Sequence, residues 1–270
     1  MELQEQVLDA RGCKTRYWVG GNPAAGLVVF THGASLNHHE WDATLPIVAE
    51  RYRVLAWDVR GHGLSRPASF TIADAVADLL GILDNLRVGQ ATLVGHSMGG
   101  NLHQELVFHH PERVAAMVCV DCTWNFQKPS SVEAFALKAA RPMLKMYPYS
   151  LLVNQSLAAT ATARASQDRL RLAVTLLSKD EFIEVTMATT QCLHYEPGYR
   201  INKPLLLIVG EKDATGNIRK SMPLWSQEEP KSRLVVVPNA RHAPNLDAPE
   251  FFHKELMGFL EETAREASNA

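Results

Sequence analysis

The stretch Gly95-His96-Ser97-Met98-Gly99-Gly100 decides how this chain is interpreted. It directly follows the apolar run 91–94 and opens a segment with helical character. A serine between a strand and a helix sits on a tight, strained turn, which leaves no room for a Cβ two residues before or after it. Gly95 and Gly99 occupy those two positions. The pattern therefore predicts a nucleophile elbow, with the Ser97 hydroxyl held clear of the backbone and the positive end of a helix dipole behind it.

The composition limits the class of protein. The chain has 270 residues, 46% of them hydrophobic, which is enough for one large α/β core that carries an insertion. Charged residues make up 21%, the formal net charge is -2 and like charges do not cluster, which argues against nucleic-acid and membrane-surface partners. No signal-peptide pattern and no apolar run of membrane-spanning length occurs. We therefore expect a cytoplasmic protein, a monomer or homodimer, that binds a small-molecule substrate.

The order of strand-like and helix-like segments predicts the fold class. Apolar runs bounded by turn residues alternate with segments of helical period, which is typical of an α/β fold with a mostly parallel sheet covered on both faces. We expect a helix over 71–86 and a last helix capped by Asp247 and Glu250, with residues 261–270 frayed. Eight strands are expected, the first two as an antiparallel edge, at residues 2–8, 15–19, 27–31, 53–57, 91–94, 114–120, 204–209 and 233–237.

The strand pattern stops between residues 123 and 200. Helix-favouring stretches at 131–144, 150–171 and 172–189 replace it, which predicts a core of residues 1–122 and 201–270 and a helical cap, residues 123–200, inserted after the sixth strand. Most aromatic and methionine side chains of the insert are expected to form its own core, and a minority an apolar roof over Ser97. Trp124 and Phe126 are the candidates for substrate binding. The full set is Trp124, Phe126, Phe135, Met143, Met146, Tyr147, Tyr149, Phe182, Met187 and Tyr195.

Two further polar side chains are candidates for chemistry with the serine. Serine is a poor nucleophile without a base within hydrogen-bonding distance, and the base needs an acid to orient it. His242 follows the last predicted strand and so belongs to the same carboxyl edge of the sheet as Ser97. Asp213 ends the preceding strand and is the favoured acid. Glu211, two residues earlier, and Asp121, at the end of the strand before the insert, remain alternatives.

An oxyanion would need two backbone N–H donors. Met98, directly after the serine, is one candidate, and Ala34, in the loop after the strand 27–31, is the other. Gly33 would let this loop approach the site closely, and His32 is expected to brace the loop through hydrogen bonds.

No metal or cofactor site is expected. Cys119 and Cys122 lie three apart on a predicted strand and face opposite sides of it, so we expect packed core thiols rather than ligands or a disulfide. The adjacent residues His38-His39-Glu40 point apart, which favours a solvated loop over a metal site. Neither a phosphate-binding nor a dinucleotide-binding motif occurs.

Taken in order, several motifs resemble the α/β-hydrolase family, and the resemblance spans the chain outside the insert. It implies a Ser97, Asp213, His242 triad, and a structural role for the turn at 58–65. A serine rather than an aspartate at position 97 argues against the haloalkane dehalogenase and epoxide hydrolase branches. The motifs are His32-Gly33, Asp58-Val59-Arg60-Gly61-His62-Gly63-Leu64-Ser65, Gly95-His96-Ser97-Met98-Gly99-Gly100, Lys203-Pro204, Gly210-Glu211-Lys212-Asp213 and His242.

The resemblance leaves the substrate open, since relatives with this pattern include esterases, thioesterases, lactonases, C–C bond hydrolases and perhydrolases. We expect a carboxylesterase-type serine hydrolase that cleaves a small or medium hydrophobic ester, or a related thioester or lactone, through an acyl-enzyme. Hydrolysis of a C–C bond in a diketone-like ring-cleavage product, perhydrolysis, and a ligand receptor built on the same fold are the alternatives.

Overall fold

One eight-stranded sheet forms the centre of the computed structural model, which describes residues 3–269. The strand order is β1-β2-β4-β3-β5-β6-β7-β8. β2 pairs antiparallel with β1 and β4, and all other pairs are parallel. The predicted fold class and antiparallel edge are confirmed, while residue 2 of the first predicted strand lies outside the described residues. The strands are β1 (Gln4–Ala10), β2 (Cys13–Gly21), β3 (Leu27–Thr31), β4 (Arg53–Trp57), β5 (Ala91–His96), β6 (Val114–Val120), β7 (Leu205–Gly210) and β8 (Ser232–Val237).

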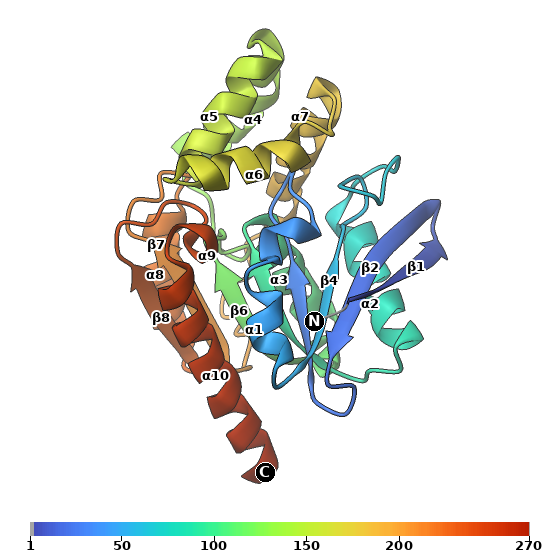
Figure 1. Cartoon of the computed structure of the whole chain (residues 1–270). Helices are drawn as coiled ribbons and strands as arrows, with labels where there is room; N and C mark the ends of the chain where they lie inside the picture. The colour runs from blue at the N-terminus through green and yellow to red at the C-terminus, as the bar shows by residue number, and fades with distance from the viewer. Residues whose placement is uncertain (1–2, 270) are drawn as a thin grey trace.

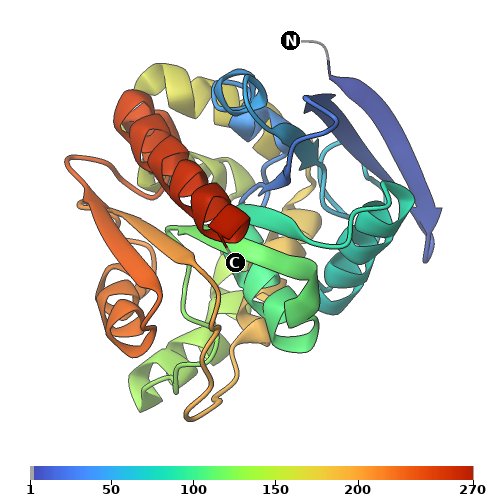
Figure 2. The ribbon, with the colours of Figure 1, turned by 90° about the horizontal axis from the view of Figure 1, so that it is seen from below.

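Helices cover both faces of the sheet, as Figure 2 shows in the view from below. On one face, α2 (Ile72–Asn85), α3 (Met98–His109) and α8 (Ile218–Glu228) pack on the sheet through one buried apolar cluster. On the other face, α1 (Leu45–Ala49) and α10 (Pro249–Asn269) share a second cluster. The strands β3 to β7 are therefore buried from both sides, which explains their continuous apolar sequences, whereas the edge strands β1 and β8 are partly exposed.

Some of the helix ends have the capping residues that the sequence predicts, and others do not. The Thr71 hydroxyl accepts from the Asp74 backbone N–H at 3.0 Å and caps α2, as predicted. The predicted capping role of Asp247 is wrong. Asp247 ends the short helix α9 (Pro244–Asp247), and its carboxylate accepts from the Arg241 N–H at 2.8 Å. Proline, which suits a first helical position, begins α10 instead at residue 249.

The predicted fraying of residues 261–270 is also wrong for the described part. α10 continues to Asn269. Glu261 pairs with Arg265 one turn further on at 3.7 Å and with the exposed Arg51, which follows α1. Ion pairs at this spacing and good helix formers such as alanine stabilise the polar end of the helix.

Four helices and a short 3-10 turn stand between β6 and β7, and Figure 1 shows α4 to α7 together at one end of the sheet. The single helical stretch expected at 150–171 is two helices. They separate at residues 161–163 because the Thr162 N–H donates to Asp247 at 2.7 Å rather than continuing the helix. No helix among residues 3–269 has the length and apolar character needed to cross a bilayer. The elements are α4 (Ser131–Met146), α5 (Tyr149–Thr160), α6 (Arg164–Val174), α7 (Lys179–Ala188) and the 3-10 helix η3 (Thr189–Cys192).

These helices contact the loops at the carboxyl edge of the sheet. Their apolar cluster includes Leu36 from the loop after β3, and Leu246 of α9 packs against it. The Ala243 N–H donates to the Thr160 carbonyl of α5 at 2.8 Å. The inserted segment is therefore attached to the loops that follow β3 and β8.

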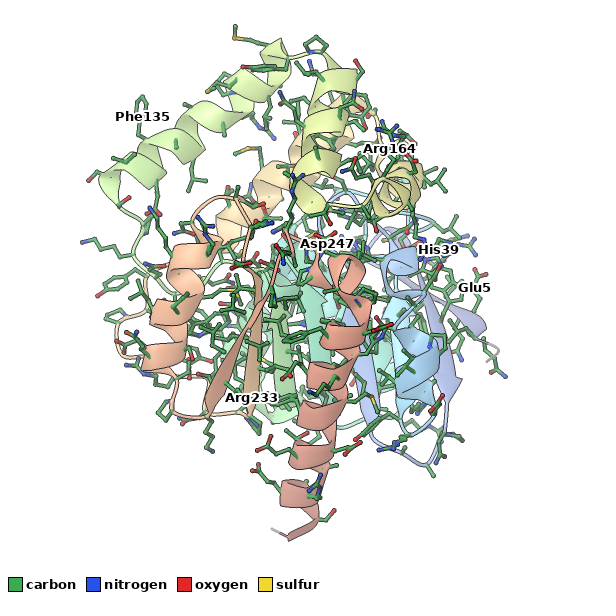
Figure 3. The ribbon with its side chains drawn as sticks, turned by 60° about the vertical axis from the view of Figure 1, so that its left-hand side comes forward. Glu5, His39, Phe135, Arg164, Arg233 and Asp247 are labelled. Atoms are coloured by element: carbon green, nitrogen blue, oxygen red, sulfur yellow. The ribbon has the colours of Figure 1, made fainter. Side chains whose placement is uncertain are left out.

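The expectation that most aromatic and methionine side chains of the insert form its core is wrong for half of them. Phe182 is buried, but Phe135 and Met146 are 74% and 84% exposed. α4 contains no buried residue at all. Figure 3 shows Phe135 projecting from α4, away from the rest of the chain. The others exposed are Met143, Tyr147 and Tyr195.

Candidate active site

The turn between β5 and α3 has the strained geometry expected from its sequence. Ser97 has φ +49° and ψ −112°, and its N–H donates to the Val120 carbonyl at 2.8 Å. A Cβ on Gly95 would lie 2.4 Å from the backbone carbon of Gly99, and one on Gly99 would lie 2.4 Å from the Thr31 carbonyl oxygen. Only glycine fits at both positions, and the partly exposed serine projects between them.

Three side chains predicted from separate parts of the sequence meet at this turn. The Ser97 Oγ lies 3.0 Å from His242 Nε2, and Asp213 Oδ2 lies 3.2 Å from His242 Nδ1. Asp213 follows β7 and His242 follows β8, so adjacent parallel strands deliver both to one edge of the sheet. The Asp213 side chain is fully buried and that of His242 is 9% exposed.

The electrostatics suit a neutral histidine beside an ionised aspartate. Burial lowers the pKa of His242 below its usual value, although the hydrogen bond to Asp213 opposes this. Burial acts in the other direction on Asp213, but the hydrogen bond and charge of His242 and the Thr215 N–H outweigh it and hold the Asp213 pKa at about 2. Near neutral pH, His242 can therefore accept a proton at Nε2 while Asp213 accepts from Nδ1–H.

The two alternative carboxylates have other partners. Glu211 is exposed and accepts from the Asn239 N–H at 2.8 Å. Asp121 is fully buried, and both of its carboxylate oxygens accept from the Gly210 N–H, at 3.0 and 3.1 Å. Burial and the charge of Asp213 raise the Asp121 pKa well above its usual value. Both causes favour the neutral form of the Asp121 carboxyl beside the charged Asp213.

Asp121, Asp213 and His242 each offer a ligand atom, and these atoms lie within 4.8 Å of one another. Asp213 and His242 already form a hydrogen bond with each other, however, and the raised pKa of Asp121 makes its carboxyl group a weak cation ligand. The donor set therefore suits a hydrogen-bonded chain better than a metal ion. Cys119 and Cys122 are buried free thiols, as predicted. The expectation that they face opposite sides of the strand is wrong, because β6 ends at Val120 and both thiols belong to the same apolar cluster.

The loop after β3 lies against the serine turn. A Cβ on Gly33 would lie 2.7 Å from His96 Nδ1, so only glycine allows this approach. The Val59 N–H donates to His32 Nε2 at 3.0 Å and His32 Nδ1 lies 2.8 Å from the Gly33 carbonyl, which braces the loop as expected. In the part of the chain that the structure describes, the N–H groups of Ala34 and Met98 donate to no other residue. Both candidate oxyanion donors are therefore available to a ligand.

The 3-10 helix η1 (His38–Trp41) corrects the expectation of a solvated loop. His39 is exposed, but His38 and Glu40 are 7% and 3% exposed. His38 Nδ1 lies 2.7 Å from Asp58 Oδ1. The expectation that adjacent residues point apart is wrong for the two histidines, whose ring centroids lie 4.0 Å apart. His38 and Glu40 reach partners that lie far away along the sequence. Sequence reasoning missed them because no local pattern encodes those partners.

The two candidate substrate-binding residues differ in their surroundings. Phe126 is fully buried and packs against Phe108 and Tyr199, with ring centroids 5.3 and 4.7 Å away. These are the contacts of a core side chain and do not favour a role in substrate binding. Trp124 is partly buried and stacks on Trp225, and within the described residues its indole N–H has no partner.

Comparison with known proteins places the chain in a family. The family model described as "alpha/beta hydrolase fold" matches residues 26–249. The chain is 28% identical to pimeloyl-[acyl-carrier protein] methyl ester esterase from Nitrosomonas europaea, over 83% of this chain and 92% of that protein. It is 27% identical to 2-(acetamidomethylene)succinate hydrolase from Mesorhizobium japonicum, over 87% of this chain and 88% of that protein.

A solved structure is similar along almost the whole length. The enol-lactonase from Burkholderia xenovorans LB400 has a TM-score of 0.83 with 21% sequence identity, over 95% of this chain and 100% of that chain. Its fold, the family match and the strand order agree. This chain belongs to the α/β-hydrolase fold family.

Proposed function

We propose that this protein is a serine hydrolase of the carboxylesterase type, which cleaves a small or medium hydrophobic ester, or a related thioester or lactone, through an acyl-enzyme. The observation that carries the proposal is the continuous hydrogen-bonded chain from the Ser97 hydroxyl through His242 to Asp213. A similar protein is by name a methyl ester esterase, which supports an ester as the substrate class.

In the proposed acylation step, Ser97 Oγ attacks the carbonyl carbon of the substrate while His242 Nε2 takes the hydroxyl proton. Asp213 holds the His242 Nδ1–H, which fixes the required tautomer and stabilises the imidazolium. The C–O bond to the alcohol then breaks, and His242 returns the proton to the leaving alkoxide. The 3.0 and 3.2 Å separations support direct transfer without an intervening water.

The N–H groups of Met98 and Ala34 are proposed to bind the negative oxygen of the tetrahedral intermediate. Met98 is the first residue of α3, so its N–H lies at the positive end of the helix. In deacylation, His242 activates a water that attacks the acyl carbonyl, and Ser97 leaves with the proton. A lost oxyanion donor costs such enzymes about 10²- to 10³-fold in turnover.

We also propose that residues 1–122 and 201–270 form the catalytic core and that residues 123–200 form a helical cap. The hydrogen bond from Ala243, next to His242, to Thr160 of α5 supports this arrangement. Trp124 is a candidate for substrate contact, since the neighbouring Thr123 carbonyl accepts from Asn101 near the start of α3 at 3.0 Å. A cap of this kind would set the preferred acyl length.

The test is turnover of p-nitrophenyl esters of increasing acyl length by the wild type and by Ser97→Ala. The variant should fold normally and lose about 10⁴-fold or more in kcat, because the nucleophile is gone. Ser226→Ala is the matched control, since the Ser226 hydroxyl bonds to Ser232 at 2.9 Å in another part of the chain. Wild-type turnover retained by Ser97→Ala would exclude the mechanism. A wild type that binds but never turns over such esters would favour a receptor.

A further inference from the structure

A buried carboxylate, Glu40 of η1, lies among three segments of the chain that converge on the candidate active site. The residue is 3% exposed and its side chain is fully buried. Burial of a carboxylate is costly unless charges and hydrogen-bond donors compensate for it. Each of the partners that Glu40 finds comes from a different segment next to Ser97.

The first partner is the loop after β3. The Gly33 N–H donates to Glu40 Oε2 at 2.9 Å, directly before Ala34. The second is β5, where His96 Nδ1 lies 2.6 Å from Glu40 Oε1. The third is α9, from which Asn245 Nδ2 donates to Oε1 at 3.5 Å. One carboxylate therefore connects the candidate oxyanion loop, the nucleophile turn and the loop of His242.

His96 continues the connection to the base. Its Nε2–H donates to the His242 carbonyl oxygen at 2.7 Å, and the two rings lie 4.9 Å apart. The other ring nitrogen faces the Glu40 carboxylate, so the arrangement suits a doubly protonated, positively charged His96.

The pKa directions agree with an ion pair. Burial would lower the pKa of His96, but the charge of the adjacent Glu40 carboxylate outweighs it and raises the pKa. Burial would raise the pKa of Glu40, but the charge of His96 and the hydrogen bond from the Gly33 N–H lower it. Both directions favour the charged form of each group.

We propose that Glu40 and His96 are positioning residues, whose buried pair holds the His242 backbone and the loop of Ala34 in register with Ser97; this inference rests on the proposed function. Neither side chain touches the reacting atoms. They act by aligning His242 and the loop of Ala34, which do contact the reacting atoms in the proposed mechanism. A misplacement of about 1 Å at such a site costs on the order of 100-fold in rate.

The experiment compares Glu40→Ala with Glu40→Gln. Alanine removes every contact, so kcat should fall on the order of 100-fold with little change in KM. Glutamine keeps the geometry without the charge, because its oxygen can accept from Gly33 and its NH2 can donate to a neutral His96. Glu40→Gln should therefore recover most of kcat. All rates are divided by the fraction of sites that a fluorophosphonate probe labels, which removes the effect of unfolded protein.

Asp78→Ala is the matched control. Asp78 is equally buried and pairs with Arg60 at 2.7 Å, but it lies in α2 and contacts none of the candidate catalytic groups. This variant should lose stability and keep wild-type kcat per labelled site. If Glu40→Ala does not fold, Glu40→Asp replaces it. The shorter carboxylate keeps the charge but cannot reach all partners, and kcat should again fall at constant KM.

The outcomes separate this inference from the proposed function. If the wild type neither labels nor turns over an ester, the proposed function fails and the inference with it. If the wild type is active and the variants at Glu40 keep wild-type kcat per labelled site, only the inference is overturned. It is also overturned if Glu40→Ala, Glu40→Gln and Asp78→Ala lose activity to the same extent, since that indicates a purely structural role.

Discussion

Replacement of Asp213 by asparagine should separate its charge from its shape. The pKa of Asp213 falls from 3.8 to about 2 in the folded protein, which corresponds to roughly 2.5 kcal/mol in favour of the ionised form. An amide lacks that charge and can also donate to His242 Nδ1, which favours the wrong tautomer. We therefore expect Asp213→Asn to fold and to lose about 10⁴-fold in kcat, measured with a p-nitrophenyl ester.

The same shift has a consequence for stability. A lowered carboxyl pKa stabilises the folded state above the unfolded value of 3.8, and this contribution is lost as the pH falls through about 2. Between these two pH values, the free energy of unfolding of the wild type should therefore fall by roughly 2.5 kcal/mol more than that of Asp213→Asn. Urea unfolding followed by circular dichroism measures both.

Asp121→Asn is the control for both measurements. The raised pKa of Asp121 favours its neutral form, and asparagine can still accept from the Gly210 N–H and donate to Asp213. Its kcat should fall by less than about tenfold. If Asp121→Asn were as inactive as Asp213→Asn, or if Asp213→Asn kept wild-type kcat, the choice of Asp213 as the acid would be incorrect.

Three further outcomes follow from the packing and electrostatics. Because burial lowers the pKa of His242, kcat/KM should fall with decreasing pH through a single limb below pH 6.5, and a limb above that value would contradict a buried neutral base. Gly95→Ala should lower the free energy of unfolding by about 1–3 kcal/mol or more, since the new Cβ meets backbone at 2.4 Å, whereas Gly89→Ala has nothing within 4 Å and should be neutral. Phe126→Ala should lower the free energy of unfolding by about 3–5 kcal/mol, because the side chain is buried. Phe135→Ala removes an exposed side chain and should lower it by less than about 0.5 kcal/mol. Urea unfolding measures these free energies. Equal losses for Gly95→Ala and Gly89→Ala, or for Phe126→Ala and Phe135→Ala, would show that the packing is described incorrectly.

Strand positions could be predicted from the sequence because each central strand is a short apolar run between turn residues. β3 and β4 begin and end where expected. The inserted helices were harder to predict, since their ends depend on partners elsewhere in the chain. Thr162 ends α5 by donating to Asp247, 85 residues further on.

The candidate site could be predicted where it depends on strand ends, but not where it depends on residues that only the fold brings together. Strand ends and chain order were enough to select Ser97 and His242, since parallel strands bring their carboxyl ends to one edge. Chain order favoured Asp213 over Asp121, although both follow strands beside His242. The coordinates add that the Asp213 carboxylate is the one that lies 3.2 Å from His242 Nδ1. Glu40 was missed because its partners, Gly33 and His96, are assembled only by the fold.

The most direct test of the account is the site at which a fluorophosphonate reacts, determined by mass spectrometry of the digested protein. We expect a single adduct on the peptide that contains Ser97, formed rapidly by the wild type and far more slowly by His242→Gln. An adduct on a different residue, or equally fast labelling without His242, would contradict a hydroxyl activated by that imidazole.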